Sequence, residues 1–221
     1  MNARDEILAR IQRCFPPEPR SSADDHAAVP RAYVQSGTLD PEARLDLFEE
    51  RLRDYGAEVF RCAPLQLPET IALAMQSAGI TTLLVAKGVA SEWLPAANKL
   101  PAGDGKALSF VRDENLSYDD LDRSQGLLTT CAVAVALTGT IILRHEQDGR
   151  RALTLIPDYH LCIVRAAQVL ETVPEAIRAI DDPARGPITT ISGPSATSDI
   201  EMTRIKGVHG PRKLCVILVL Q

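Results

Sequence analysis

The sequence predicts an α/β fold with a mixed, largely parallel sheet flanked by helices. Between residues 40 and 86, amphipathic helical segments alternate with short apolar runs of strand length, the pattern of a parallel sheet covered on both faces. The second half is richer in strand-like runs. The last run, over residues 213–220, is so apolar that we expect a central, buried strand.

The first 38 residues are expected to stand apart from this fold. Apolar residues at helical spacing predict a helix over residues 2–14, with Asn2 as its cap. Residues 15–38 contain prolines and serines and little apolar periodicity, which predicts a long connector or lid. We therefore divide the chain into an N-terminal helical arm and connector, residues 1–38, and an α/β domain, residues 39–221.

The first half of the domain is regular. Asp40 and Pro41 predict the start of a helix, and Gly56 its end. The elements expected after it are a strand over 57–62, a helix over 68–77 ended by Gly79, a strand over 81–86, a short helix from a Ser91 cap through 98, and a strand over 107–111.

The second half is expected to contain a tight β-meander. Its strands are expected over 127–137 and 140–144, around Thr138-Gly139, and over 151–156 and 160–164, around Pro157-Asp158. A helix over 173–180, a strand over 187–191, a turn-rich loop over 192–198 and the final strand should follow.

Composition excludes several classes of protein. A net charge of −5 argues against a nucleic-acid partner, because phosphate binding requires a basic face. No run of 18 apolar residues predicts a membrane span, and the charged start is unlike a signal peptide, so we expect a cytoplasmic protein. Dinucleotide, P-loop, serine-hydrolase and zinc-protease motifs are all missing from the sequence.

The five cysteines are scattered, and none forms a CxxC pair. We therefore expect no metal and no iron–sulfur cluster held by this chain alone. Cys131, Cys162 and Cys215 lie in apolar runs, which is typical of buried thiols in a reducing compartment.

A serine-rich loop is the strongest candidate binding motif. Ser192, Gly193 and Ser195 follow a strand, and Ser198 and Glu201 have capping-box spacing for a helix that would also include Asp199. Hydroxyl groups and free amides at a helix start suit a phosphate or carboxylate. A well-capped loop without a ligand is the alternative.

Three further turns could contribute. The turn before the last strand contains His209, an acid or base, and Arg212, an anion clamp. Thr138, Gly139 and Thr140 could present amides and hydroxyl groups to an anion. Asp158 and His160 could relay a proton. Each also has a purely structural interpretation, since such residues are common in turns.

Four blocks of sequence together resemble one family. They are ALTGTIIL (136–143), LTLIPDYHLCIV (153–164), ISGPSATSDIE (191–201) and GVHGPRKLCVILV (207–219). They are similar to the lactate-utilization (LUD) domain, and within that family to the branch of lactate utilization protein C. The similarity covers most of residues 40–221, and the last two blocks are the specific part.

The resemblance implies a fold like that of the sugar-phosphate isomerase and coenzyme A transferase superfamily. It also implies a role in oxidising L-lactate to pyruvate beside two partner proteins that carry the iron–sulfur clusters. The chain departs from the family at two positions. Leu137 stands where the family usually has a glutamate, and Ala132 stands where an aspartate is common. Two carboxylates that could act as base, nucleophile or ligand are therefore missing.

We expect an accessory component of L-lactate utilization that binds a small anionic ligand and docks to iron–sulfur partners. The residues expected at the ligand are Thr138, Gly139, Thr140, Ser192, Gly193, Ser195, Ser198, Asp199, His209 and Arg212; we assign no catalytic residue. One alternative is a stand-alone isomerase- or transferase-like enzyme acting on a phosphorylated or coenzyme A-linked acid. Another is a degenerate family member that only scaffolds.

Overall fold

The computed structural model describes residues 2–14, 26–95, 107–180, 186–197, 205–206 and 210–220. The chain divides into two compact units, Met1–Tyr33 and Val34–Gln221. The expected boundary between residues 38 and 39 stays a prediction.

The first unit contains helix α1 (Ala3–Arg13). The side chain of Asn2 caps it, because Asn2 Oδ1 accepts a hydrogen bond from the backbone N–H of Asp5 at 2.9 Å. Ile7, Leu8 and Ile11 are exposed along this helix. The predicted N-terminal helix and its cap are therefore confirmed.

The second unit is built on a six-stranded sheet in which every neighbouring pair of strands is parallel. The last strand lies inside it, because β12 pairs with β1 on one side and with β7 on the other. In spatial order the strands are β1 (Glu58–Cys62), β12 (Lys213–Val219), β7 (Tyr159–Arg165), β4 (Leu127–Thr129), β2 (Thr82–Val85) and β3 (Ser109–Arg112).

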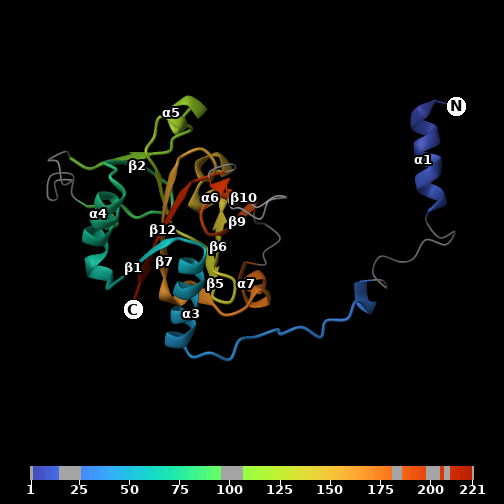
Figure 1. Cartoon of the computed structure of the whole chain (residues 1–221), viewed down its shortest axis with the longest axis horizontal. Coiled ribbons are helices and arrows are strands. Elements are labelled where there is room, and N and C mark those ends of the chain that lie inside the picture. The colour runs from blue at the N-terminus through green and yellow to red at the C-terminus, as the bar shows by residue number, and fades with distance from the viewer. Residues whose placement is uncertain are drawn as a thin grey trace. The chain divides into compact units, whose positions relative to one another are not determined.

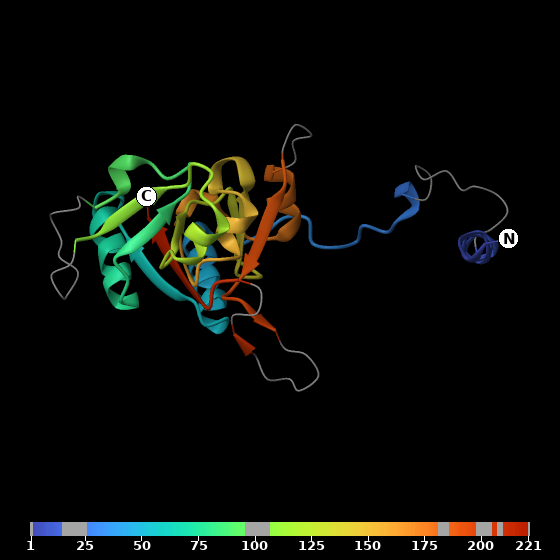
Figure 2. The same cartoon turned by 90° about the horizontal axis from the view of Figure 1, so that it is seen from above.

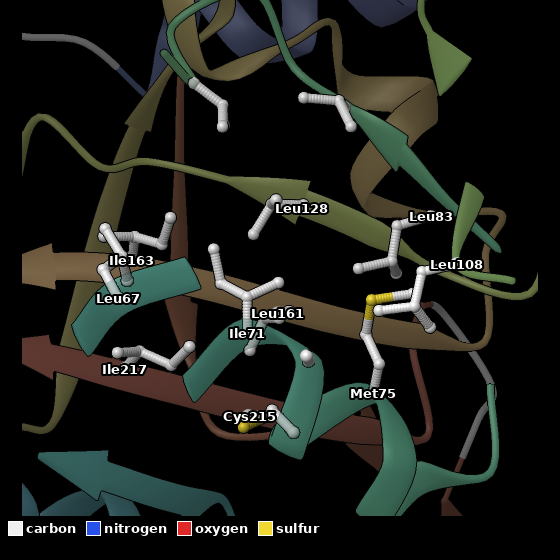
Figure 3. Packing of buried hydrophobic residues seen from close by; sticks show 14 of the residues in the cluster. Leu67, Ile71, Met75, Leu83, Leu108, Leu128, Leu161, Ile163, Cys215 and Ile217 are labelled. Carbon is white, nitrogen blue, oxygen red and sulfur yellow. The ribbon is translucent and has the colours of Figure 1, made fainter. Parts of the chain in front are cut away.

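Helix α4 (Leu67–Ala78) covers one face of this sheet (Figure 1). Figure 3 shows Ile71 and Met75 on the helix side of a cluster that Leu161 and Cys215 complete from the strands. Gly79 ends the helix in a left-handed conformation (φ 72°), as the sequence predicts. These contacts bury one side of the parallel sheet.

The opposite face is covered by helix α3 (Pro41–Asp54) and by a second sheet (Figure 2). Phe48 and Leu52 of α3 pack with Val216 and Leu218 of β12. The second sheet has the order β8 (Val169–Leu170), β5 (Val133–Val135), β6 (Thr140–Arg144) and β9 (Ile188–Ser192), and helix α7 (Val173–Ile180) packs on its strands β5 and β6.

Shorter elements join these layers. They are the 3-10 turns Pro64–Gln66, Ser91–Trp93, Arg151–Thr154 and Ala166–Gln168, the helices α5 (Tyr118–Asp122) and α6 (His145–Asp148), and the strands β10 (Ala196–Thr197) and β11 (Ile205–Lys206), which pair with each other. No helix in the described part of the chain is long and apolar enough to cross a membrane.

The fold class is confirmed, since a largely parallel sheet is flanked by helices. The strand pair expected around Thr138-Gly139 is also confirmed, because β5 and β6 pair antiparallel there, but the larger β-meander is wrong. The run over residues 127–137 is two strands in different sheets, because the chain leaves the parallel sheet after β4. The run over 151–156 contains a 3-10 turn instead of a strand. Leu153 of that turn is buried against Leu84 and Leu127, so its apolar character comes from packing and not from pairing.

The short helix expected from Ser91 through residue 98 is also different. Residues 91–93 form a single 3-10 turn, and Ala90, not Ser91, stands at its N-cap position. The backbone is already extended at Leu94. Residues 96–98 lie outside the described part of the chain.

Because Phe48 is fully buried between α3 and the sheet, we expect the stability of the fold to depend strongly on it. Phe48→Ala should lower the free energy of unfolding by about 3–5 kcal/mol, because it removes apolar contacts and leaves a cavity. Leu65→Ala is the control, since Leu65 is 96% exposed; it should change stability by less than about 0.5 kcal/mol. Urea unfolding measures both, and equal effects would contradict this packing.

Candidate functional site

The serine-rich loop lies beside the turn that precedes the last strand. The backbone N–H of Ser195 donates a hydrogen bond to the carbonyl of Pro211 at 2.8 Å. The two segments border a cleft of about 260 Å³, which we call the hydroxyl-lined cleft. Its lining residues are Arg151, Thr154, Leu155, His160, Thr189, Thr190, Ile191, Ser192, Gly193, Pro194, Ser195, Gly210, Pro211 and Leu214.

The Thr-Gly-Thr turn is connected to this cleft through hydroxyl groups. Thr138 Oγ1 and Thr140 Oγ1 are 2.7 Å apart, and Thr140 Oγ1 is 2.8 Å from Ser192 Oγ. The pairing of strands β6 and β9 produces this row of hydroxyl contacts, because Thr140 lies directly opposite Ser192. The two threonines do not line the cleft themselves, so they act on it only by orienting Ser192.

Two glycines of the predicted site allow close packing against α3. Gly193 has φ +81°, and a Cβ there would lie 2.5 Å from Tyr55 Cβ. Gly139 has φ +59°, and a Cβ there would lie 2.9 Å from Arg51 Cβ. A larger residue at either position would therefore be strained and would also clash with the helix. Their role in the structure is to bring β6, β9 and α3 together.

Several expected site residues are not in the cleft or cannot be placed. Arg212 is exposed, and its Nε donates to Asp158 Oδ1 at 2.5 Å instead of reaching the lining. Ser198, Asp199 and His209 lie outside the described residues, as does the helix start expected near Ser198. The structure thus brings together Ser192, Gly193 and Ser195.

The last strand does not lie beside the strand that precedes the serine-rich loop. β12 pairs with β1 and β7, whereas β9 pairs with β6. The cleft therefore lies where β7 and β12 begin. In open α/β sheets ligands usually bind at the opposite, carboxyl edge.

Sequence reasoning missed Arg151 and Thr154, which lie on the 3-10 turn that was expected to be a strand. Arg151 is exposed, and among the described residues it is the cation that lines the cleft. Hydroxyl donors beside a guanidinium make an arrangement that can bind a carboxylate, phosphate or sulfate. No residue spacing in the sequence pointed to this turn.

His160 also lines the cleft, in a role other than the expected relay. Its Nε2 lies 2.8 Å from Thr129 Oγ1, whereas Asp158 pairs with Arg212. Burial lowers the pKa of His160 to about 4. The ring is therefore neutral near pH 7, and it contributes hydrogen bonding to the cleft floor without contributing charge.

The two positions that the resemblance describes as usually acidic, 137 and 132, carry no carboxylate in this chain. Leu137 is 46% exposed, and Ala132 is half-buried against the cluster under α7. Among the described residues, no group of three or more His, Cys, Asp and Glu side chains is placed to hold a metal ion. Cys62, Cys131, Cys162 and Cys215 are buried free thiols, as expected for the last three.

Comparison with known proteins connects most of the chain to one family. The sequence model described as "LUD domain" matches residues 45–219. Lactate utilization protein C of Deinococcus radiodurans is 45% identical over 221 residues, covering 98% of this chain and 95% of that protein. Lactate utilization protein C of Bacillus pumilus is 33% identical over 232 residues, covering 98% and 96% of the two chains.

A solved structure has the same fold. The crystal structure of a DUF162 family protein from Deinococcus radiodurans superposes with a TM-score of 0.65 at 38% sequence identity. The match covers 82% of this chain and 99% of the other.

The buried His160 predicts a component of acid sensitivity. Its pKa is about 4 when folded and 6.5 ordinarily, so the unfolded chain takes up the proton first as the pH falls. Stability from this group is complete above about pH 6.5 and is lost towards about pH 4. Between pH 7.5 and pH 4.5, the wild type should lose about 2 kcal/mol more stability than His160→Gln, which stays neutral. Urea unfolding at both pH values measures this, and equal losses would contradict it.

Proposed function

Because the chain belongs to the LUD domain family, we propose that it is an accessory component of lactate utilization. The observation that carries this proposal is the 45% identity to a lactate utilization protein C over nearly the whole length of both chains. The match spans 98% of this chain, so it extends over nearly the whole fold. The proposal for this chain is thus a contribution to the oxidation of L-lactate to pyruvate.

The redox centres of this reaction are proposed to lie on iron–sulfur partner proteins. Oxidising a hydroxy acid requires an electron acceptor, and the four buried cysteines are spread over β1, β7, β12 and the segment after β4. The thiols of Cys131 and Cys162 are close enough to hydrogen-bond to each other, but a pair is too few for a cluster, which needs several thiolates around one centre. In this proposal the chain docks to partners that carry the clusters.

The ligand of this chain is proposed to be a small anion in the hydroxyl-lined cleft. Arg151 supplies a positive charge, and Ser192 and Ser195 supply hydroxyl groups near it, whereas the Thr154 hydroxyl already donates to the Arg151 carbonyl. The neutral His160 on the floor does not add charge. With neutral side chains at positions 132 and 137, a binding role accounts for these residues better than acid–base catalysis by a paired carboxylate.

The role in lactate utilization is tested by growth of the source organism. Deleting the gene should abolish growth on L-lactate as carbon source and leave growth on pyruvate unchanged, because pyruvate enters after the oxidation. A plasmid copy of the wild-type gene should restore growth, and Leu65→Ala should restore it equally, since Leu65 is an exposed position away from the core. Normal growth of the deletion strain on L-lactate would contradict the role.

The accessory role has a separate enzymatic test. The purified chain should not turn over coenzyme A thioesters or sugar phosphates. Turnover at about 1 per second or faster would favour the stand-alone enzyme instead.

The anion site is tested by calorimetry with sulfate. Arg151→Gln and Ser195→Ala should each weaken sulfate binding, the first by roughly tenfold, because a charge-assisted contact is lost. Arg123→Gln is the matched charge control, since Arg123 lies on the exposed end of α5. If Arg123→Gln and Arg151→Gln weaken binding equally, or if sulfate does not bind, the cleft is not an anion site.

A further inference from the structure

A second cavity, of about 310 Å³, lies at the carboxyl edge of the parallel sheet. Three strands of the sheet end at it. Gly88 follows β2, Thr130 follows β4, and Arg165 is the last residue of β7, and all three line the cavity. Open α/β sheets usually bind their ligands at this edge. The cavity is thus separate from the hydroxyl-lined cleft, which lies where β7 and β12 begin.

Within the described part of the chain, the charged residues that line the cavity are two arginines and one aspartate. Arg144 ends β6 of the second sheet, Arg165 ends β7 of the first, and Asp148 lies on α6. The Nε of Arg144 is buried and has no hydrogen-bond partner among the described residues. A buried donor of a charged group that lacks an acceptor is costly, so an anion in the cavity would supply what the protein does not.

Both carboxylate oxygens of Asp148 already accept hydrogen bonds from neighbouring residues. Asp148 is 2% exposed, its Oδ1 accepts a hydrogen bond from Thr130 Oγ1 at 2.5 Å, and its Oδ2 accepts one from the backbone N–H of Arg144 at 2.8 Å. Burial raises the pKa of Asp148, and these two donors and the Arg144 charge oppose that rise. As a carboxylate, Asp148 balances one of the two arginines and leaves one positive charge in the cavity.

We infer that this cavity is a binding site for a small carboxylate monoanion, held by Arg144 and Arg165. One net positive charge matches one carboxylate, whereas a doubly charged phosphate would be only half neutralised beside Asp148. Trp93 and Ala132 supply apolar surface for the carbon skeleton of the acid. The inference does not depend on the proposed function or on the hydroxyl-lined cleft.

The site is tested by calorimetry on the full chain near pH 8, with propionate, L-lactate and inorganic phosphate as probes. Inorganic phosphate is mostly doubly charged there, because pH 8 lies above its second pKa. Propionate or L-lactate should bind, and the part of phosphate binding that Arg165→Gln removes should be weaker, since phosphate can also bind in the hydroxyl-lined cleft. Arg165→Gln should weaken carboxylate binding roughly tenfold or more, since it removes a charge-assisted contact. Arg123→Gln, on the exposed end of α5, should leave it unchanged.

A second pair of variants isolates the charge of the cavity from its shape. Ala132 lines the cavity, and Ala132→Asp adds a negative charge there, whereas Ala132→Asn adds a side chain of nearly the same size without charge. Ala132→Asp should weaken carboxylate binding roughly tenfold more than Ala132→Asn does. The melting temperature of each variant is measured to verify folding. If Ala132→Asp does not fold, Arg165→Gln decides the question.

Three results would overturn the inference. The first is that neither propionate nor L-lactate binds. The second is that Ala132→Asp and Ala132→Asn bind carboxylates equally well. The third is that Arg151→Gln abolishes carboxylate binding while Arg165→Gln retains it, because the ligand would then lie in the hydroxyl-lined cleft.

Discussion

The pairing of the final strand is the constraint on which the rest of the structure depends. β12 is paired along its whole length with β7 and along five residues with β1. Its side chains alternate between the two main clusters, with Cys215, Ile217 and Val219 under α4 and Leu214, Val216 and Leu218 under α3 and the second sheet. A chain that had not yet made its last seven-residue strand would lack the centre of both clusters.

The same strand decides where the hydroxyl-lined cleft lies. The register of β12 against β7 fixes Pro211 just before the strand, where its carbonyl receives the Ser195 N–H. The Ser192–Thr140 contact fixes the other end of the loop on the second sheet. The serine-rich loop is thus attached to both sheets, and its position depends on packing between residues far apart in the sequence.

Elements whose boundaries or apolar runs are marked locally could be predicted from the sequence, and those fixed by packing between distant segments could not. Asp40, Gly79 and the apolar run of β12 carry their structure in their immediate sequence. The run over 127–137 is apolar apart from Thr129 and Thr130, and threonine is itself common in strands, so no local signal marks Thr130 as the point where the chain changes sheets. Likewise, Arg151 and Thr154 line the cleft because the turn that contains them is anchored by the buried Leu153. A short apolar run in the sequence does not distinguish such a buried turn from a paired strand.

The change of sheets at residues 130–132 also explains why the missing acid at position 132 matters. This segment borders the second cavity, and Thr130 holds Asp148 there. The resemblance to the LUD family places an aspartate where this chain has Ala132. With that aspartate, two arginines would face two carboxylates and the cavity would have no net charge. With alanine, one arginine charge is left for a ligand. In the proposed carboxylate site, the position at which the resemblance implies a lost carboxylate is therefore also the one that leaves a net positive charge among the described lining residues.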